Sequence, residues 1–469
     1  MTSAWFGLNT ALSALRAAQT QLDVSAHNTA NANTPGYSRQ RVELIAGEPY
    51  SYPAFNRSGL PGQIGTGVTV AQIQRVRDAF LDGQLREQLG LQGQWQTRSD
   101  ELAKVETILP EPASSGLGSA LSTFWNAWQD VATDPSSTAA RTALLEQAAT
   151  LAQRFGSAAG QLKSLIGGQD YQVGQQVASV NDLAARIASL NAQIQRVAVT
   201  GDQPNDLADQ RDQLLAQLST ILPVDVQPQA DGTVNVLVGG TDLVSGLRAR
   251  AVTTAPDAVG HAVPTWSSGG AVELGDGRLA QYVALRDTVL PGYLAQLNTL
   301  AKGIADAVNG LHQSGVDESG AAGLAFFTYA TGDEAASLAV NAAVAADPTK
   351  VAAATAANQP GDGGQAGAIA DLRSALLFGS GTQSATDFYA GLVGRVGSDT
   401  RQAADMATNQ GLVVDHLQQL QQSTSGVSLD EEAADMIRFQ HAYQAAARVI
   451  TAMDEMLDQL VNRTGLVGR

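Results

Sequence analysis

Two amphipathic segments at opposite ends of the chain constrain the fold more than any other feature. Near the C-terminus, apolar residues recur at steps of three and four, which is the spacing of one helix face. These residues are Met436, Phe439, Tyr443, Ala446, Ile450, Met453, Leu457 and Leu460. A shorter stripe near the N-terminus consists of Leu8, Leu12, Leu15 and Leu22, with the polar Gln19 inside it. Because neither helix can bury its stripe alone, we predict that the two pair with each other or with neighbouring copies. Assembly, rather than catalysis, is therefore the first hypothesis.

Composition excludes several classes of function. The chain has 469 residues, enough for about two to four domains, and a formal net charge of -17, which argues against a nucleic-acid surface. It contains no cysteine, so disulfides, thiolate metal sites and thiol nucleophiles are excluded. The N-terminus lacks the basic start and unbroken apolar core of a signal peptide. No stretch reaches the roughly 18 apolar residues of a membrane span, so we expect no membrane insertion.

A turn motif is predicted directly after the N-terminal helix, which we expect over 4–33. Pro35 and Gly36 suit the second and third positions of a type II turn, where the third residue has a positive φ. Asn28, Asn31 and Tyr37 surround this turn, and asparagine tolerates helix ends and left-handed geometry. Two short strands, near 41–44 and 68–70, flank a Gly- and Pro-rich loop.

The middle of the chain alternates between helical and strand-like patterns. We predict helices over 77–222 with breaks at Pro110 and Pro112, at Pro135, at Gly167-Gly168 and at Gly201. Between 223 and 285 the period changes to two, with a hairpin turn at Asp231-Gly232. Helix returns at 285, and a long helix covers 384–424.

The expected fold is therefore mainly α with a small β insert. It combines paired terminal coiled-coil helices, a helical-bundle middle domain and an outer β domain. The predicted division is a terminal assembly region (1–70 and 425–469), a helical rod domain (71–222 and 286–424) and an inserted β domain (223–285).

The last helix has a clear predicted start. Ser428 and Glu431 form the pattern of a capping box, in which the serine caps a free backbone N–H and the glutamate reaches back. The helix then continues to about residue 463.

Several segments resemble the axial proteins of bacterial flagella. The run ANANTPGYSR at 30–39 is similar to their N-terminal signature, and the runs VSLDEE at 427–432 and MIRFQ at 436–440 are similar to their shared C-terminal helix. Three middle segments narrow the resemblance to the hook-associated protein 1 family within these axial proteins. They are PNDLADQRDQLL at 204–215, RDTVLPG at 286–292 and VNGLH at 308–312.

This resemblance implies a structural subunit at the junction between hook and filament. It also implies self-association in a helical array, contacts with hook subunits and with the next hook-associated protein, and help from an export chaperone. Export through the flagellar type III apparatus, without a cleavable signal peptide, would place the protein outside the cell. The terminal regions are expected to be poorly ordered in the free subunit.

Two other classes of function stay open from the sequence. A hook or distal-rod subunit would carry similar ends, and an exported enzyme or adhesin could use the same scaffold. No catalytic, metal or cofactor motif supports the enzyme: the five histidines are scattered and no phosphate-binding glycine loop is present. Asp202, Asp206, Asp209 and Asp212 have helical spacing rather than that of a calcium loop. We expect them to form a solvated helix face with Arg211 nearby.

Overall fold

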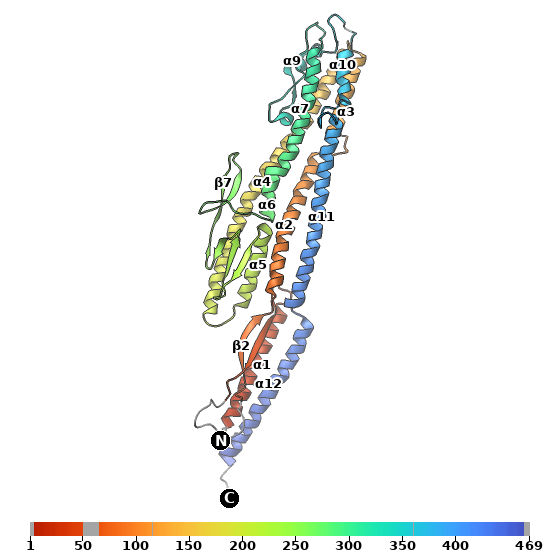
Figure 1. Ribbon diagram of the computed structural model, residues 1–469. Helices are drawn as coiled ribbons and strands as arrows, with labels where there is room; N and C mark the ends of the chain where they lie inside the picture. Colours follow the sequence, from red (N-terminus) through yellow and green to blue (C-terminus); the bar gives the residue numbers. More distant parts are fainter. Residues whose placement is uncertain (1–3, 50–64, 115, 360, 464–469) are drawn as a thin grey trace.

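The protein is a long rod with both chain termini at one end (Figure 1). The computed structural model describes residues 4–49, 65–114, 116–359 and 361–463, without the side chains of Ala4, Trp5, Leu460 and Arg463. The side chain of the predicted stripe residue Leu460 is therefore not described. Most of the predicted loop after residue 46 also lies outside the described residues. Figure 1 shows a terminal unit at one end and a longer helical body beyond it. The mainly α fold, the paired terminal helices and the small β insert are confirmed.

The terminal unit consists of two helices and a hairpin. Helix α1 (Ala4–Ala30) lies beside α12 (Leu429–Asp458), which a short π-helical segment, η4 (Gln459–Arg463), extends. Strands β1 (Gln40–Ala46) and β2 (Val68–Arg75) pair antiparallel and pack on α1. Helix α1 ends three residues before the predicted 33, because the N–H of Asn31 is shared between the carbonyls of His27 and Asn28 as the chain turns.

Long helices build the body. Helices α2 (Ala79–Ile108) and α11 (Ala385–Ser425) lie side by side along it, each with a capped N-terminus. Asp78 accepts from two backbone N–H groups of α2, and Ser384 forms a capping box with Asp387 at α11. Helices α3 (Leu117–Thr133), α4 (Thr138–Ala198) and α5 (Asn205–Ile221) complete this part.

The break predicted at Gly167-Gly168 is wrong. Helix α4 runs through both glycines for 61 residues, or about 90 Å at roughly 1.5 Å per residue. A glycine costs a helix about 1 kcal/mol relative to alanine. Here that cost is outweighed, because α4 packs into a hydrophobic core on each side of the pair.

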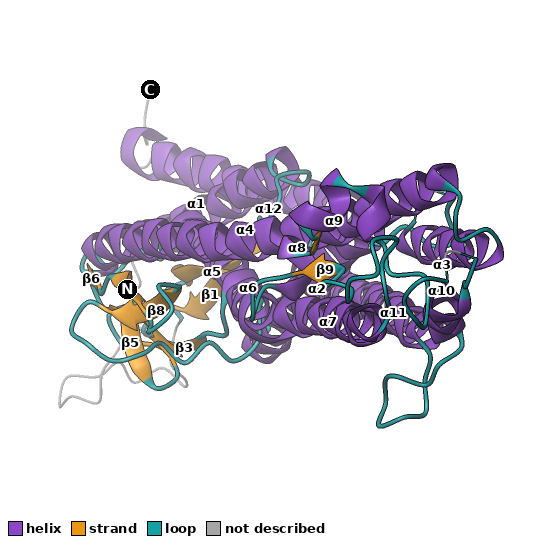
Figure 2. Ribbon diagram, turned by 90° about the horizontal axis from the view of Figure 1, so that it is seen from above, coloured by secondary structure: helices purple, strands orange, loops and turns teal. Residues whose placement is uncertain are grey.

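The β insert does not have a core of its own. Strands β3 (Asp225–Pro228), β4 (Val234–Val238), β5 (Thr241–Ser245) and β6 (Arg248–Ala249) form an antiparallel sheet, and β7 (Val252–Pro256) pairs with β8 (Ala262–Trp266). The predicted hairpin turn is present, with Gly232 at a φ of 81°. Figure 2 shows the strands gathered on one side of the helices. Their apolar face shares a core with α4 and α5, so the packing crosses the division that we predicted at 223.

Helix returns earlier than predicted. It begins with α6 (Arg278–Ala284), passes through a π-helical segment, η1 (Leu285–Val289), and continues as α7 (Leu290–Ser314). The π-turn directly precedes Pro291, which lacks an N–H and would clash with an ordinary helical carbonyl. Short elements then form the end of the rod that is remote from the termini. They are β9 (Phe327–Thr328), α8 (Glu334–Ser337), β10 (Ala339–Val340), α9 (Ala342–Ala346), η2 (Pro348–Lys350), α10 (Gly364–Ala370) and η3 (Asp371–Arg373).

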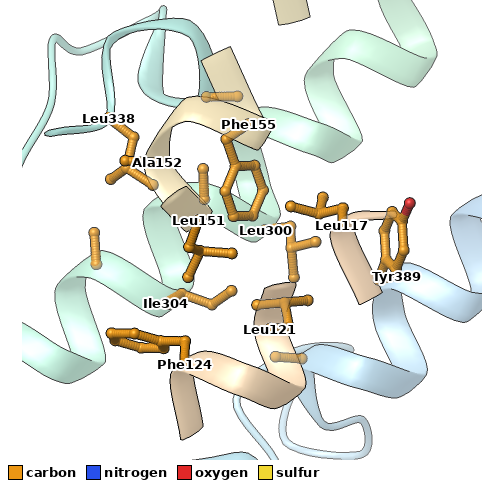
Figure 3. Packing of buried hydrophobic residues seen from close by; sticks show 14 of the residues in the cluster. Leu117, Leu121, Phe124, Leu151, Ala152, Phe155, Leu300, Ile304, Leu338 and Tyr389 are labelled. Atoms are coloured by element: carbon orange, nitrogen blue, oxygen red, sulfur yellow. The ribbon is translucent and has the colours of Figure 1, made fainter. Parts of the chain in front are cut away.

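Two large hydrophobic clusters hold the body together. The upper core joins α3, the first half of α4, α7 and the start of α11, with Phe124 and Phe155 fully buried (Figure 3). The lower core joins the second half of α4, α5 and the β strands. A third, small cluster packs Leu85 and Leu89 of α2 against Val414 of α11.

His312, from the VNGLH segment, fixes the loops at the remote end. Its ring is fully buried: Nδ1 lies 2.6 Å from the Leu324 carbonyl oxygen, and Nε2 accepts from the Ala352 N–H at 2.9 Å. With these partners Nδ1 carries the proton and the ring is neutral. Burial lowers the pKa of His312 below its ordinary value of 6.5.

The free energy of unfolding should therefore depend on the protonation of His312. Because the unfolded chain binds this proton more readily, the stabilisation is complete above pH 6.5 and is lost as the pH falls below that value. The His312→Phe variant should be less stable at pH 8, yet lose less stability than the native protein between pH 8 and pH 5.5. Urea unfolding at both pH values, with the exposed His441→Gln variant as control, measures this. An identical pH dependence in native protein and His312→Phe would contradict the assignment.

Candidate assembly interface

The face of α1 that meets α12 is made of small residues. Ala11, Ala18, Ser25 and Asn28 are buried, and a Cβ added at Gly7 would overlap the Met453 side chain. An apolar groove between the helices is lined by Gly7, Ala11 and Ala14 on one side. Its other side is lined by Ala442, Ala446, Val449 and Met453 of α12. Small side chains let the two backbones approach closely.

The predicted leucine stripe of α1 is not this contact face. Leu8, Leu12, Leu15 and Leu22 are only half-buried, and Gln19 is exposed. Leu8, Leu12 and Leu15 each come one residue after a member of the small face, and Leu22 comes after the half-buried Gln21. One residue corresponds to a rotation of roughly 100° around a helix. The stripe therefore borders the buried small face and does not form its centre. A third face of α1 meets the hairpin, where Ser13 accepts from the N–H of Val68 at 3.3 Å.

The predicted stripe of α12 lies closer to its contact face. Met436, Phe439, Ile450, Met453 and Leu457 are half-buried, and Ala446 between them is buried. Tyr443 is 36% exposed and thus lies at the edge of the contact. Within the described part of the chain, the buried apolar side chains of α1 and α12 are all alanines. The pair therefore buries no large apolar side chain completely.

Asn28 is the centre of a buried polar cluster above the groove. Its amide nitrogen donates to the Gln40 carbonyl at 2.9 Å and to Glu432 Oε1 at 3.2 Å. Its amide oxygen accepts from the Tyr37 hydroxyl at 2.7 Å and from the Gln40 N–H at 2.9 Å. One side chain thus joins α1, the turn, β1 and α12. Burial, with Asp206, Asp209 and Glu432 nearby, raises the pKa of Tyr37 well above its ordinary value, so its hydroxyl stays a donor.

Glu432 connects the same cluster to α12. Its carboxylate is 2% exposed and accepts from Ser25 Oγ at 2.6 Å and from Arg39 Nε at 2.7 Å. Burial opposes the charge of Arg39, but Glu432 and Glu431 outweigh it and raise the pKa of the guanidinium. The Arg39 N–H also donates to the Ser425 carbonyl at 2.8 Å, at the end of α11. Neither Arg39 nor Glu432 was predicted as a site residue, although both lie inside the family-like segments.

The terminal unit is attached to the body by the aspartates of α5. Asp209 accepts from the N–H of Ser38 at 2.9 Å and from its hydroxyl at 2.7 Å. Arg75 of β2 donates to Asp209 at 2.7 Å and to Asp212 at 2.8 Å, and these carboxylates raise its pKa, with Asp212 contributing more. Gln40 donates to Asp206 at 2.7 Å.

The expected solvated acidic face is present at Asp202 and Asp206, which are exposed, but the expectation is wrong for Asp209. Asp209 is 5% exposed, and its charge is balanced by arginines of the terminal unit, which helical spacing within α5 could not reveal. Arg211 is directed elsewhere and donates to Asn191 and to the Gly232 carbonyl.

The predicted turn has the geometry expected of it. Tyr37 N–H donates to the Thr34 carbonyl at 3.2 Å, and Gly36 has a φ of 76°. The Pro35 carbonyl accepts from the Gln213 side chain of α5, so the turn itself touches the body. Asn31 caps the end of α1, with its amide nitrogen 3.0 Å from the His27 carbonyl oxygen.

The predicted helix cap is present in part. Ser428 Oγ accepts from the N–H of Glu431 at 3.5 Å. The Glu431 carboxylate does not reach back to complete a capping box, because it pairs with Arg39 at 2.6 Å. An ion pair across the interface thus replaces the local hydrogen bond.

The described residues contain neither a metal-binding group nor a membrane-spanning helix. Across these ranges, no group of three or more His, Asp or Glu is placed to hold a metal ion. None of the described helices combines the length and apolar character needed to cross a bilayer.

Replacing the buried carboxylate should open the terminal pair. Glu432→Gln removes the charge that faces Arg39, and a lost hydrogen bond to a charged group costs about 2 kcal/mol. Local opening of α12 should become roughly 30-fold more frequent, seen as faster trypsin cleavage at the exposed Arg438 and Arg448. The matched control is Glu455→Gln, an exposed glutamate on the same helix. Equal cleavage rates in the two variants would count against the role of Glu432.

Substitution of Gly36 separates backbone strain from steric conflict. Gly36→Ala places a Cβ against Gln213, whereas Gly201→Ala meets nothing within 4 Å at a similarly positive φ of 86°. Both variants should carry roughly 1–2 kcal/mol of left-handed strain. Gly36→Ala should lower the urea-unfolding midpoint further, because it also displaces the Gln213 contact. Equal urea-unfolding midpoints in the two variants would show that the contact between the turn and Gln213 does not contribute to stability.

Comparisons with known proteins agree with this architecture. A family model described as "Flagellar hook-associated protein FlgK helical domain" matches residues 102–327. Models for the flagellar basal body rod proteins match 8–37 and, as a C-terminal model, 418–463. A solved structure titled as the flagellar hook junction protein FlgK from Burkholderia pseudomallei has a TM-score of 0.66 at 18% identity. It covers 73% of this chain and 100% of that one, and it shows the likeness of fold.

Whole-chain relatives carry one name. Flagellar hook-associated protein 1 of Escherichia coli is 28% identical, covering 97% of this chain and 99% of its own. The protein of the same name from Salmonella typhimurium is 29% identical with the same coverage. The Bacillus subtilis protein is 34% identical over 510 residues, covering 100% of both chains. This chain belongs to the flagellar hook-associated protein 1 family.

Proposed function

We propose that this protein is the structural junction between the hook and the filament of a bacterial flagellum. Family membership supports the flagellar role, and the relatives are named for their association with the hook. The observation that carries the proposal is the incomplete terminal unit. Among the described apolar side chains of its two helices, only alanines are buried, so the larger apolar side chains need further partners.

The leucine stripe of α1 is the proposed surface for a neighbouring copy. Its members are Leu8, Leu12, Leu15 and Leu22, which are half-buried and lie beside the small residues that meet α12. On α12, Ile437, Val449 and Met456 are 57%, 48% and 52% exposed. Full burial of a large apolar side chain contributes about 1.5–3 kcal/mol, so covering both surfaces in each subunit would hold an array together.

These two surfaces differ from each other, so contact between them is heterologous. A heterologous contact that does not close into a ring produces a helical array. The rod shape, with the terminal unit at one end, leaves the body free to project from such an array (Figure 1). The proposed role is structural rather than enzymatic.

The junction role implies further partners. One edge of the array would meet hook subunits and the other the next hook-associated protein. Delivery would use an export chaperone and the flagellar type III apparatus, and the protein would act outside the cell.

Deletion of the gene in its host tests the junction role. We expect hooks without filaments, with filament subunits lost to the medium. Normal filaments would exclude the role, and loss of the hook itself would favour a hook or distal-rod subunit instead.

Substitution within the leucine stripe tests the proposed surface. The double variant Leu12→Ser/Leu15→Ser should be exported and keep a folded body, yet fail to restore filaments in the deletion strain. Leu247→Ser, at a leucine 46% exposed in the β insert, is the matched control and should restore them. Filament counts by electron microscopy measure the outcome, and full restoration by the double variant would disprove the surface.

A further inference from the structure

The two large cores of the body are separated by a level without buried apolar side chains on α4. Leu162 belongs to the upper core and Val173 to the lower one, and between them the buried residue of α4 is Gln169. On α6, Gln281 is likewise buried between Leu279 of the lower core and Leu285 of the upper one. Between these positions the apolar residues are only half-buried: Leu165 and Ile166 pack against the upper core, and Tyr282 and Val283 against the lower one. Fully buried apolar packing therefore does not continue from one core to the other along these two helices.

Three polar side chains fill this level, and we call them the middle layer: Glu101 of α2, Gln169 of α4 and Gln281 of α6. They are 5%, 2% and 2% exposed. Gln169 donates to Glu101 at 2.6 Å, which ties α4 to α2. Gln169 Oε1 and Gln281 Nε2, an acceptor and a donor, have no hydrogen-bond partner within the described protein. Gln281 Nε2 therefore forms no hydrogen bond from α6 to the other two side chains.

Two of the helices that cross the middle layer are also locally weak. Helix α4 carries Gly167-Gly168 here, and a Cβ at either glycine would meet nothing within 4 Å, so packing does not require them. The helix formed by α6 and α7 contains the π-turn at 285–289, followed by Pro291 and Gly292. Glycine pairs, π-turns and proline are the usual causes of helix bending.

Hydrogen bonds near the middle layer connect η1 to the lower core region and α7 to α11. Arg286 of the π-turn donates to Asp170 at 2.6 Å and to the Ala262 carbonyl at 2.7 Å, which binds η1 to the lower part of α4 and to β8. Tyr293 of α7 donates to Asp399 of α11 at 2.6 Å. Helices α2 and α11 pass through the level as a continuous pair, and long helices bend gently without a break.

We propose that the middle layer is a hinge, at which the upper bundle bends relative to the lower unit of α4, α5 and the β insert. Bending occurs about the α2–α11 pair, with α4 yielding at Gly167-Gly168 and the α6–α7 helix yielding at its π-turn. The polar layer allows this motion because it holds the two cores together by few hydrogen bonds, and no fully buried apolar side chain of α4 or α6 lies between the two cores. This hinge is independent of the proposed junction role.

Distance measurements between two spin labels test the hinge. The chain has no native cysteine, so Thr254→Cys on β7 and Ala343→Cys on α9, both exposed, can be labelled selectively. Figure 1 shows β7 and α9 on the same flank of the rod, with α9 nearer the remote end. Val252 of β7 belongs to the lower core, whereas Val344 of α9 belongs to the upper core, so bending changes the separation of the two labels. In the full-length labelled protein, double electron–electron resonance should give a broad distribution of distances.

Alanine pairs in α4 provide a matched comparison. Gly167→Ala/Gly168→Ala should narrow the distribution, because alanine stiffens the helix at the hinge. Gly160→Ala/Gly174→Ala changes two glycines of the same helix, which also have no neighbour within 4 Å of an added Cβ, but lies outside the hinge. This control should leave the distribution broad. Gln281→Leu should also narrow the distance distribution, because an apolar side chain at this position would pack against both cores.

Three outcomes would overturn the hinge. A narrow distribution in the protein without hinge substitutions would show a rigid body. Equal narrowing by both alanine pairs would show general stiffening of α4 rather than a local joint. A distribution that stays equally broad in Gly167→Ala/Gly168→Ala and in Gln281→Leu would place the motion elsewhere. Circular dichroism of each variant verifies that it is folded.

Discussion

The carboxylate of Glu432 is the interaction on which the terminal unit depends. It lies on α12 but accepts hydrogen bonds from Ser25 and Asn28 of α1 and from Arg39 before β1. A buried carboxylate without these donors would be strongly destabilising, so the three segments must come together as one arrangement. Because the remaining α1–α12 contact consists of alanines and half-covered side chains, this polar cluster supplies the specificity that packing alone lacks.

The terminal unit and the body are stabilised in different ways. The body contains large buried side chains, such as Phe124 and Trp128, in continuous cores. Closer to the termini, apolar packing is limited to the small cluster around Leu85 and then to the alanines between α1 and α12. Charge pairs such as Arg75 with Asp209 connect the elements there instead. In the proposed junction role, this gradient keeps the apolar surface needed for assembly at one end of the subunit.

Sequence patterns predicted local structure better than they predicted partners. The turn at Pro35-Gly36, the hairpin at Asp231-Gly232 and the long helices follow from residues close together in the chain. The orientation of α1 could not be predicted in this way, since its leucines outweigh its alanines in hydrophobicity although the alanines form the contact with α12. The burial of Asp209 could not be predicted from helical spacing, because its partner Arg75 is distant in sequence. Gly167-Gly168 was interpreted as a break because two cores that support α4 are tertiary features.

The central claim is that the terminal helices are an incomplete layer, ordered fully only among copies of this chain. Amide hydrogen exchange, compared between the free subunit and assembled junctions isolated from hooks, tests it most directly. In the free protein, amides of α1 and α12 should exchange far faster than those of α4 beside Phe155, and assembly should protect them. Equal protection of α1, α12 and α4 in the free subunit, unchanged by assembly, would contradict the account.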